Sequence, residues 1–373
     1  MIFHYLKIAF RNLCKHKTQN IISIIGLAVG LLCFCVCIYC SRFVESTDHC
    51  FANHDRIAEL NLYDGKADRY FSGSPVPLAV DLRTWSLGET EAISSVTYPR
   101  ERPYYVELSP EKTLPYELET IEIDTCYNKI FTPEMVAGHW KMASQSLNSV
   151  ILSQSMAIKI FGNAESAIGK HMTLMRRLNT SPESTPKTGG IVYTIQAVMK
   201  DISLNNSLDF MQNIDMLTVN DSEGLLQSPK RHNMTGANTY VLLSPQTTCT
   251  DLEKQFSKRD YTYTLYGEAY TVTASSMGAR LKKQGASYLG LVTGTVGTLI
   301  LLVGLINFFH FLIGSFFNRT KEYSIMKMIG CNWKQLFYLL FTQSLIVISI
   351  SSILVLSGIE LLGNHMNFSL PGI

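Results

Sequence analysis

Residues 21–40, IISIIGLAVGLLCFCVCIYC, carry no charged side chain. A helix needs about 20 mainly apolar residues to cross a bilayer, and this stretch meets that length. A secretory signal peptide is the alternative, but its apolar core would be shorter and would end at a small-x-small cleavage site. Here the run continues into SRFVESTDHC without a convincing site. We therefore expect a retained membrane anchor over residues 20–40.

Two further stretches are long and apolar enough to span a bilayer. The first covers residues 287–317 and is uncharged apart from His310. It exceeds one bilayer thickness, so the helix should tilt or project as a stalk. The second covers residues 336–362, and its Glu360 lies near the far end, where a carboxylate reaches headgroups or water. The sequence therefore predicts three transmembrane helices.

Basic residues indicate which side of the membrane each connection occupies. They cluster before the first span and between the second and third spans, at Lys7, Arg11, Lys15, Lys17, Arg319, Lys321, Lys327 and Lys334. The positive-inside rule assigns both clusters to the cytoplasm, and the two spans between them make the assignments consistent. The N-terminus is then cytoplasmic, whereas residues 41–286 and the tail at 363–373 are extracytoplasmic.

Composition excludes several classes of function. The net charge of +2 and the lack of a basic stripe with interleaved aromatic residues give no support for nucleic-acid binding. Neither a GxSxG elbow nor an HExxH helix is present, so we expect no enzyme, no cofactor and no metal site. A short group of His and Asp residues follows the first span, and we interpret it as solvated surface: Asp48, His49, His54 and Asp55.

The nine cysteines do not form a disulfide framework. Four lie within the first apolar run, where cysteine behaves as a small hydrophobic residue. Three fall in the extracytoplasmic segment: Cys50, Cys126 and Cys249. These three allow at most one bridge, and free or buried thiols are the alternative.

Small residues within the spans indicate helix contacts. Gly26 and Gly30 are four positions apart in the first span, and Gly290 and Gly294 repeat this spacing in the second. Such spacing allows helices to approach closely, although glycine is also common in membrane helices generally.

Two cytoplasmic segments have helical patterns. Apolar and basic residues separate onto opposite faces over residues 1–17, which predicts an interfacial helix against membrane lipids; a simple extension of the first span is the alternative. Residues 318–335 join the second and third spans. Ile325 there shares an apolar helical face with Met328 and Ile329, and Gly330 suits a helix C-cap. A short charged helix and a solvated turn are both compatible with this pattern.

The extracytoplasmic segment is long enough for a hydrophobic core. Strand patterns recur in IAELNLY, ELETIEID, IVYTIQAVM, NTYVLLS and YTYTLYGEAYTVTA, and helical patterns occur in PVPLAVDLRTW and SQSMAIKIFG. This order predicts an α+β domain. The stretch NTSPESTPKTGG has the composition of a loop.

The connection between the second and third spans resembles the cytoplasmic loop of FtsX/MacB-type ABC transporter permeases. The matching residues are Arg319, Glu322, Ile325, Lys327, Ile329 and Gly330. In that family the loop docks on a separate nucleotide-binding subunit, and the resemblance implies an ATPase-coupling role here.

A second resemblance lies in VILSQSMAIKIFGNAESAIGKHMTL. This stretch is similar to the periplasmic-core motif of MacB-type permeases, and the permeases it resembles are those of Bacteroidetes-like bacteria. The matching residues are Ser153, Ser155, Ala157, Lys159, Phe161, Gly162, Ile168, Gly169 and Lys170. We expect a helix that ends at Gly162, a turn, and a strand from His171. A phosphate-binding P-loop is rejected because the spacing from Gly162 to Gly169 is too long by two residues.

The resemblance implies a permease subunit in the bacterial inner membrane that couples ATP hydrolysis by a separate ABC ATPase to export of peptides, antibiotics or lipoproteins. Implied partners are a second permease, as homodimer or heterodimer, and a periplasmic adaptor. A membrane-anchored sensor or FtsX-like regulator without transport is the alternative. Family members have four spans per unit, so a fourth helix is missing from the predicted set.

Overall fold

The computed structural model divides the chain into two compact units, 1–46 with 285–373, and 47–284. We call them the membrane unit and the extracytoplasmic domain. The structure describes residues 11, 17–71, 73–85, 87–109, 112–145, 148–174, 190–208, 213–219, 235–265, 267–279, 286–318 and 320–366. The predicted interfacial helix at 1–17 and the loop at 179–190 lie almost entirely outside these residues.

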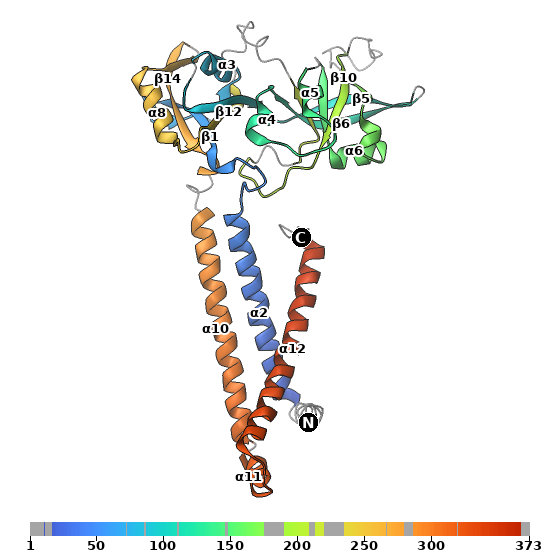
Figure 1. Ribbon diagram of the computed structural model, residues 1–373, viewed down its shortest axis with the longest axis vertical. Coiled ribbons are helices and arrows are strands. Elements are labelled where there is room, and N and C mark those ends of the chain that lie inside the picture. Colours follow the sequence, from blue (N-terminus) through green and yellow to red (C-terminus); the bar gives the residue numbers. More distant parts are fainter. Residues whose placement is uncertain are drawn as a thin grey trace. The chain divides into compact units, whose positions relative to one another are not determined.

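Three long helices and one short helix make up the described membrane unit: α2 (Lys17–Glu45), α10 (Ala286–Asn318), α11 (Thr320–Met328) and α12 (Trp333–Met366). Among the described residues, three helices are long and apolar enough to cross a membrane, namely α2, α10 and α12. This confirms the predicted number of spans. Helix α2 packs against both α10 and α12 (Figure 1). An apolar cluster of Leu27, Phe308, Phe311 and Val347 joins the three helices.

The helix ends differ from the predicted boundaries. Helix α2 continues to Glu45, so residues 41–45 belong to the membrane unit instead of the predicted domain at 41–286. Helix α12 begins at Trp333 and reaches Met366, so it takes residues from both the predicted connection and the predicted tail. The reason is that a helix continues past its apolar core as long as its backbone hydrogen bonds are satisfied, whereas hydropathy marks only the core.

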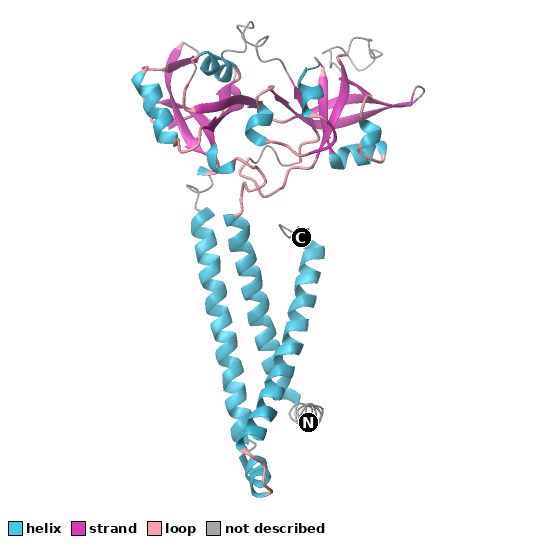
Figure 2. Cartoon of the chain, viewed as in Figure 1, coloured by secondary structure: helices cyan, strands magenta, loops and turns pink. Residues whose placement is uncertain are grey.

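The extracytoplasmic domain mixes strands and helices, as predicted (Figure 2). The first half of the chain order is β1 (Ile57–Asp64), β2 (Arg69–Tyr70), β3 (Ser74–Pro75), α3 (Pro77–Thr84), β4 (Thr90–Thr97), β5 (Arg100–Ser109), β6 (Lys112–Ile123), α4 (Tyr127–Phe131), β7 (Met135–Gly138) and α5 (Trp140–Gln145). The second half is β8 (Ser149–Ser153), α6 (Gln154–Phe161), β9 (His171–Leu174), β10 (Val192–Met199), β11 (Met216–Val219), β12 (Thr235–Leu243), α8 (Cys249–Lys258), β13 (Thr262–Leu265) and β14 (Glu268–Ser276).

Every strand and helix pattern quoted from the sequence corresponds to an element of that type. The last strand pattern is a hairpin of two strands, β13 and β14, which pair in antiparallel register from Thr262–Thr271 to Leu265–Glu268. A hairpin forms here because Gly267, with φ of +86°, supplies a turn conformation that other residues rarely adopt.

The strands form two lobes. In the first lobe, β4, β12, β1, β14 and β13 lie in that order, and α3 and α8 cover a core that includes Leu60, Leu78 and Phe256. The second lobe has six strands, each paired with the next in the order β6, β11, β8, β10, β9 and β5. Because β5 also pairs with β6, the six strands close into a ring. Tyr104, Leu118 and Met172 belong to the core of this second lobe.

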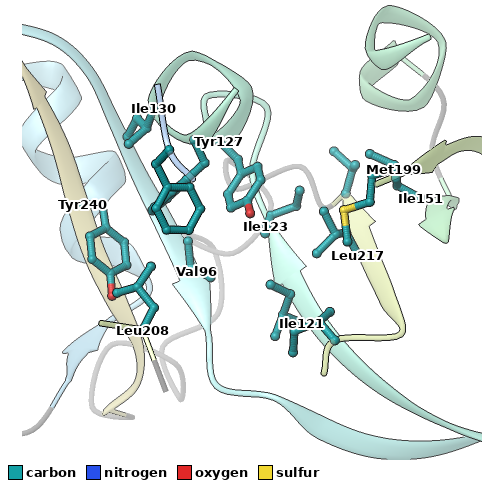
Figure 3. Close-up of a cluster of buried hydrophobic side chains, with 14 of the residues drawn as sticks. Val96, Ile121, Ile123, Tyr127, Ile130, Ile151, Met199, Leu208, Leu217 and Tyr240 are labelled. Atoms are coloured by element: carbon teal, nitrogen blue, oxygen red, sulfur yellow. The ribbon is translucent and has the colours of Figure 1, made fainter. Parts of the chain in front are cut away.

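A third core joins the lobes. Val96 and Tyr240 come from first-lobe strands, whereas Ile151, Met199 and Leu217 come from the ring, and all five belong to one buried cluster (Figure 3). Strand β8 supplies both cores, because Val150 and Leu152 lie in the second-lobe core and Ile151 lies in the junction core. Alternate side chains of a strand point to opposite faces, and both faces of β8 are covered, which explains why β8 is buried along its whole length.

A buried carboxylate reinforces the junction. Asp124, at the end of β6, pairs with the Arg83 guanidinium of α3. Its Oδ1 also accepts hydrogen bonds from the Ser94 hydroxyl at 2.8 Å and from the Cys126 amide at 2.9 Å, and its Oδ2 accepts one from the Ser95 amide at 3.0 Å. The charge of Asp124 is therefore matched by four donor residues although its side chain is almost inaccessible.

Candidate functional site

Helix α11 occupies the segment for which the sequence predicts either a charged helix or a solvated turn. It forms a helix over Thr320–Met328, and one residue, Arg319, separates it from α10. Arg319 lies outside the described residues. The Thr320 hydroxyl donates to the Phe317 carbonyl oxygen at 2.8 Å, which links the first residue of α11 to the last turn of α10.

One face of α11 is fixed to the neighbouring helices. Tyr323 is only 6% exposed, and its ring lies 5.6 Å from the ring of Phe316 on α10. Leu336 and Leu339 of α12 complete this small buried cluster. Since the cluster takes side chains from three helices, α11 is held as part of the membrane unit. Tyr323 was not among the predicted residues, although its spacing of seven residues from Phe316 is a helical repeat that could have indicated the contact.

The opposite face of α11 is apolar and open. Met328 is 80% exposed and Ile329 is 82% exposed, and Ile325 and Trp333 are exposed beside them. We call these four residues the outer patch. Exposed apolar residues that are contiguous and surrounded by charge are typical of protein or membrane contact sites.

The turn after α11 is specified by local chemistry. Gly330 has φ of +101°, its amide donates to the Lys327 carbonyl at 3.1 Å, and the Cys331 amide donates to the Met326 carbonyl at 3.0 Å. This pair of bonds is a Schellman motif, which requires a left-handed residue at the position of Gly330. Gln335 then accepts a hydrogen bond from the Asn332 amide at the start of α12.

Positive charge lies close to the outer patch along the chain. Lys321, Lys327 and Lys334 are exposed, and Glu322 is the one acidic residue between 318 and 335. The Lys327 ammonium lies 5.3 Å from the centre of the Trp333 ring, which is a cation–π distance. The predicted residues Glu322, Ile325, Lys327 and Gly330 therefore lie on one short helix and its cap, and the surface they form is basic and apolar.

The predicted glycines lie where α2 meets α10. A Cβ on Gly30 would lie 3.3 Å from the Gly304 Cα, and one on Gly26 would lie 2.5 Å from the Asn307 amide nitrogen. Gly290 and Gly294 have looser surroundings, since a Cβ there would lie 3.7 Å from the nearest side-chain atoms. The tightest backbone approach is therefore at Gly30, deep within the helix pair.

The periplasmic-core motif has an observable structural role. Gly162 has φ of +83° and ends α6, and its amide donates to the Ile158 carbonyl at 2.9 Å. The Gly169 amide donates to the Ile195 carbonyl of β10 at 2.8 Å, and the Ile195 amide returns a bond to the Lys170 carbonyl at 2.9 Å. Phe161 and Ile168 pack against the second-lobe core. These residues attach α6 to β10, with β9 starting at His171 as predicted.

A surface pocket of about 290 Å³ lies beside the start of α6. Its wall includes Asp201, Asp215 and the apolar side chain of Ile202. Burial raises the pKa of Asp215, whose Oδ2 accepts a hydrogen bond from the Glu119 amide at 2.9 Å. These residues could not be identified as a site from local sequence patterns, although the polar residues of DISLNNS (201–207) could have indicated a loop.

The interpretation of residues 48–55 as solvated surface is wrong for Asp48. Its side chain is buried and its Oδ1 accepts a hydrogen bond from the Ser207 amide at 2.6 Å. Asp55 is exposed, as predicted, and lies 3.3 Å from the ring of His54. Within the described ranges, no three His, Cys, Asp or Glu residues are placed to hold a metal ion. Cys50, Cys126 and Cys249 carry free thiols.

Comparisons with solved structures found chains that are similar to part of this one. A domain from a protein described as a candidate permease of Porphyromonas gingivalis is 20% identical, with a TM-score of 0.45 over 61% of this chain and 93% of that one. The periplasmic region of MacB from Actinobacillus actinomycetemcomitans is 14% identical, with a TM-score of 0.41 over 65% and 96%. The extracellular domain of the noncanonic ABC-type transporter YknZ from Gram-positive bacteria is 12% identical, with a TM-score of 0.34 over 59% and 99%.

A comparison with curated proteins found no match. The family model for the FtsX-like permease C-terminal domain matches residues 294–372, which include most of α10, all of α11 and α12. This match confirms the FtsX-type resemblance in the segment that contains the outer patch. Residues 294–372 therefore match the FtsX-like permease C-terminal domain, and the described residues include three helices that are long and apolar enough to cross a membrane.

Proposed function

We propose that this chain is the transmembrane permease subunit of an ABC transporter of MacB/FtsX type, and that a separate ABC ATPase binds α11. The observation that supports this role most strongly is the outer patch on a helix whose other face is fixed by Tyr323. A soluble partner that contacts Met328 and Ile329 would therefore act on α10 and α12 as well.

The surface selects for a partner of complementary chemistry. Four apolar side chains can fill a groove, and the lysines at its edge favour an acidic rim. Because Gly330 and Asn332 fix the angle between α11 and α12, displacement of α11 would be passed to α12 with little loss in the connecting turn.

In this proposal the N-terminus, α11 and the ATPase lie in the cytoplasm, and residues 47–284 lie in the periplasm of a bacterium, with the helices in the inner membrane. Two permease subunits, as homodimer or heterodimer, would bind two ATPases. Closure of the ATPases would move the membrane helices, and the extracytoplasmic domains would then act on a peptide, antibiotic or lipoprotein, with a periplasmic adaptor as a further partner.

The test is co-purification of an ABC ATPase with the tagged full-length chain from native membranes, with both proteins quantified by mass spectrometry. Replacing Met328 and Ile329 together with Asp should reduce the ATPase recovered by more than about tenfold, because central apolar contacts carry most binding energy. Replacing Glu322 and Lys327 with Ala should weaken recovery less, since charges at a rim contribute less than the centre.

Ile158→Asp is the matched control, because Ile158 is an exposed isoleucine of α6 in the extracytoplasmic domain. It should leave ATPase recovery unchanged. Equal recovery with the Met328/Ile329 variant and the wild-type chain, at equal amounts of permease, would reject the proposed role of α11.

A further inference from the structure

The chain enters and leaves the extracytoplasmic domain at neighbouring points. One residue separates Thr47 and Asp48 from the end of α2 at Glu45, and the Thr47 hydroxyl donates to Asn205 Oδ1 at 3.1 Å. The Asp48 amide donates to the Asn205 carbonyl oxygen at 3.1 Å. The incoming chain is thus attached to residues 201–208, the segment that follows β10. We call this segment the linking loop.

The Asp48 side chain makes the strongest of these attachments. It is only 6% exposed, and its Oδ1 accepts a hydrogen bond from the Ser207 amide at 2.6 Å. Its backbone has φ of +72°, a conformation that residues other than glycine adopt only when the surroundings enforce it. A hydrogen bond from an amide to a charged carboxylate is stronger than a hydrogen bond between two neutral groups.

The outgoing chain meets the same carboxylate. Gly278 follows β14, has φ of +72°, and a Cβ built on it would lie 2.9 Å from Asp48 Oδ2. The preceding amide, of Met277, donates to the Ile57 carbonyl of β1 at 2.9 Å. The absence of a side chain at Gly278 therefore allows the outgoing backbone to lie against Asp48.

The other end of the linking loop is attached to the second lobe. Asp201 Oδ1 accepts hydrogen bonds from the Ser155 amide at 3.1 Å and the Ser155 hydroxyl at 2.9 Å, at the first turn of α6. Between the two ends, Leu208 is buried in the junction core and Ile202 packs against it. The loop therefore connects the point where the chain enters the domain to the helix of the distant lobe.

We propose that Asp48 is a positioning residue that joins the incoming and outgoing chain to the linking loop, so that displacement of α2 reaches α6 in the second lobe. The assumption that an ATPase causes this displacement rests on the proposed function. The attachment itself rests only on contacts within residues 47–284, and it can be tested on the chain without an ATPase.

Hydrogen–deuterium exchange of the full-length chain in lipid nanodiscs tests this inference. Replacing Asp48 with Ala leaves the Ser207 amide without its acceptor, and we expect exchange of that amide to accelerate by about tenfold or more. Because the loop is held at both ends, the Ser155 amide should also accelerate. The Asp251 amide donates to the Thr248 hydroxyl, the N-cap of α8 in the first lobe, at 3.3 Å, and its exchange rate should be unchanged.

Asp55→Ala is the control, because Asp55 is an exposed aspartate seven positions away whose carboxylate lies 3.3 Å from the His54 ring. This control should leave the exchange rates of the Ser207 and Ser155 amides unchanged. Slow exchange of the β8 amides checks that each variant is folded. Should Asp48→Ala fail that check, Gly278→Ala places a methyl group against the carboxylate and should accelerate the same two amides.

Unchanged exchange at Ser207 in folded Asp48→Ala would overturn the attachment. Acceleration at Ser207 with an unchanged Ser155 would overturn transmission to the second lobe. Neither result depends on ATPase recovery, so failure of the proposed function and failure of this inference are distinguishable.

Discussion

The extracytoplasmic domain and the membrane unit are held together by different interactions. In the domain, buried polar groups have several partners each, as Asp124 has with Arg83, Ser94 and Ser95. In the membrane unit, α2 and α10 approach most closely at glycines, where Gly30 lies against Gly304. The difference follows from the solvent: burial of apolar groups drives folding in water, whereas lipid chains are as apolar as the helices and leave close packing as the main attraction.

The largest expected effect is in the domain. Asp124→Ala should reduce its free energy of unfolding by about 3–5 kcal/mol, because the Arg83 guanidinium keeps its hydrogen bond to the Ile93 carbonyl but loses the buried carboxylate that balances its charge. Thermal unfolding of the full-length chain, followed by the tryptophan fluorescence of Trp85 and Trp140, measures this change.

Glu134→Ala is the control for Asp124→Ala. Glu134 pairs with Lys200 at 3.1 Å, but both side chains are mostly exposed, so its loss should change stability by about 0–1 kcal/mol. Similar destabilisation by both variants would show that burial of the charge pair is not what distinguishes Asp124.

A smaller effect is expected in the membrane unit. Gly30→Ala places a methyl group 3.3 Å from the backbone of Gly304, which cannot rotate away as a side chain would. Overpacking of this kind costs about 1–3 kcal/mol. Faster hydrogen exchange in α2 and a lower unfolding temperature in the same detergent would measure it.

The matched variant is Gly290→Ala, whose methyl group would meet Val44 at an ordinary contact distance of 3.7 Å. It should be neutral or slightly stabilising, because alanine favours a helix over glycine. If the two variants were equally destabilising, helix propensity and not close approach would explain the glycines, and the contrast between the two units would lose its basis.

Local signals in the sequence were sufficient for part of the structure. The three apolar helices could be predicted because the absence of charge over a full span is visible without knowing any contact. The end of α6 at Gly162 could be predicted because a left-handed glycine stops a helix by itself. The turn at Gly330 follows the same rule.

Distant contacts could not be predicted in this way. The parallel pairing of β11 with β6, from Met216–Thr120 to Val219–Ile123, closes the ring between segments almost a hundred positions apart. Asp48 could not be distinguished from exposed Asp55 because its partner, Ser207, is far along the chain. At α11, the pattern identified the charged residues but not Tyr323, whose burial depends on side chains of two other helices.

The smallest expected effect concerns the contribution of one exposed carboxylate, that of Asp251, to the stability of the domain. Asp251 belongs to the capping box of α8, and hydrogen bonds from the Thr248 hydroxyl, and then from Lys254, lower its pKa to about 2. Since the pKa is lower in the folded state than in the unfolded state, the contribution of Asp251 is present above about pH 4 and is lost as the pH falls towards 2. Asp251→Asn should remove this part of the acid sensitivity. The difference in unfolding temperature between wild type and variant should therefore shrink from pH 5 to pH 2, whereas a difference that stays constant with pH would show that the cap acts without its charge.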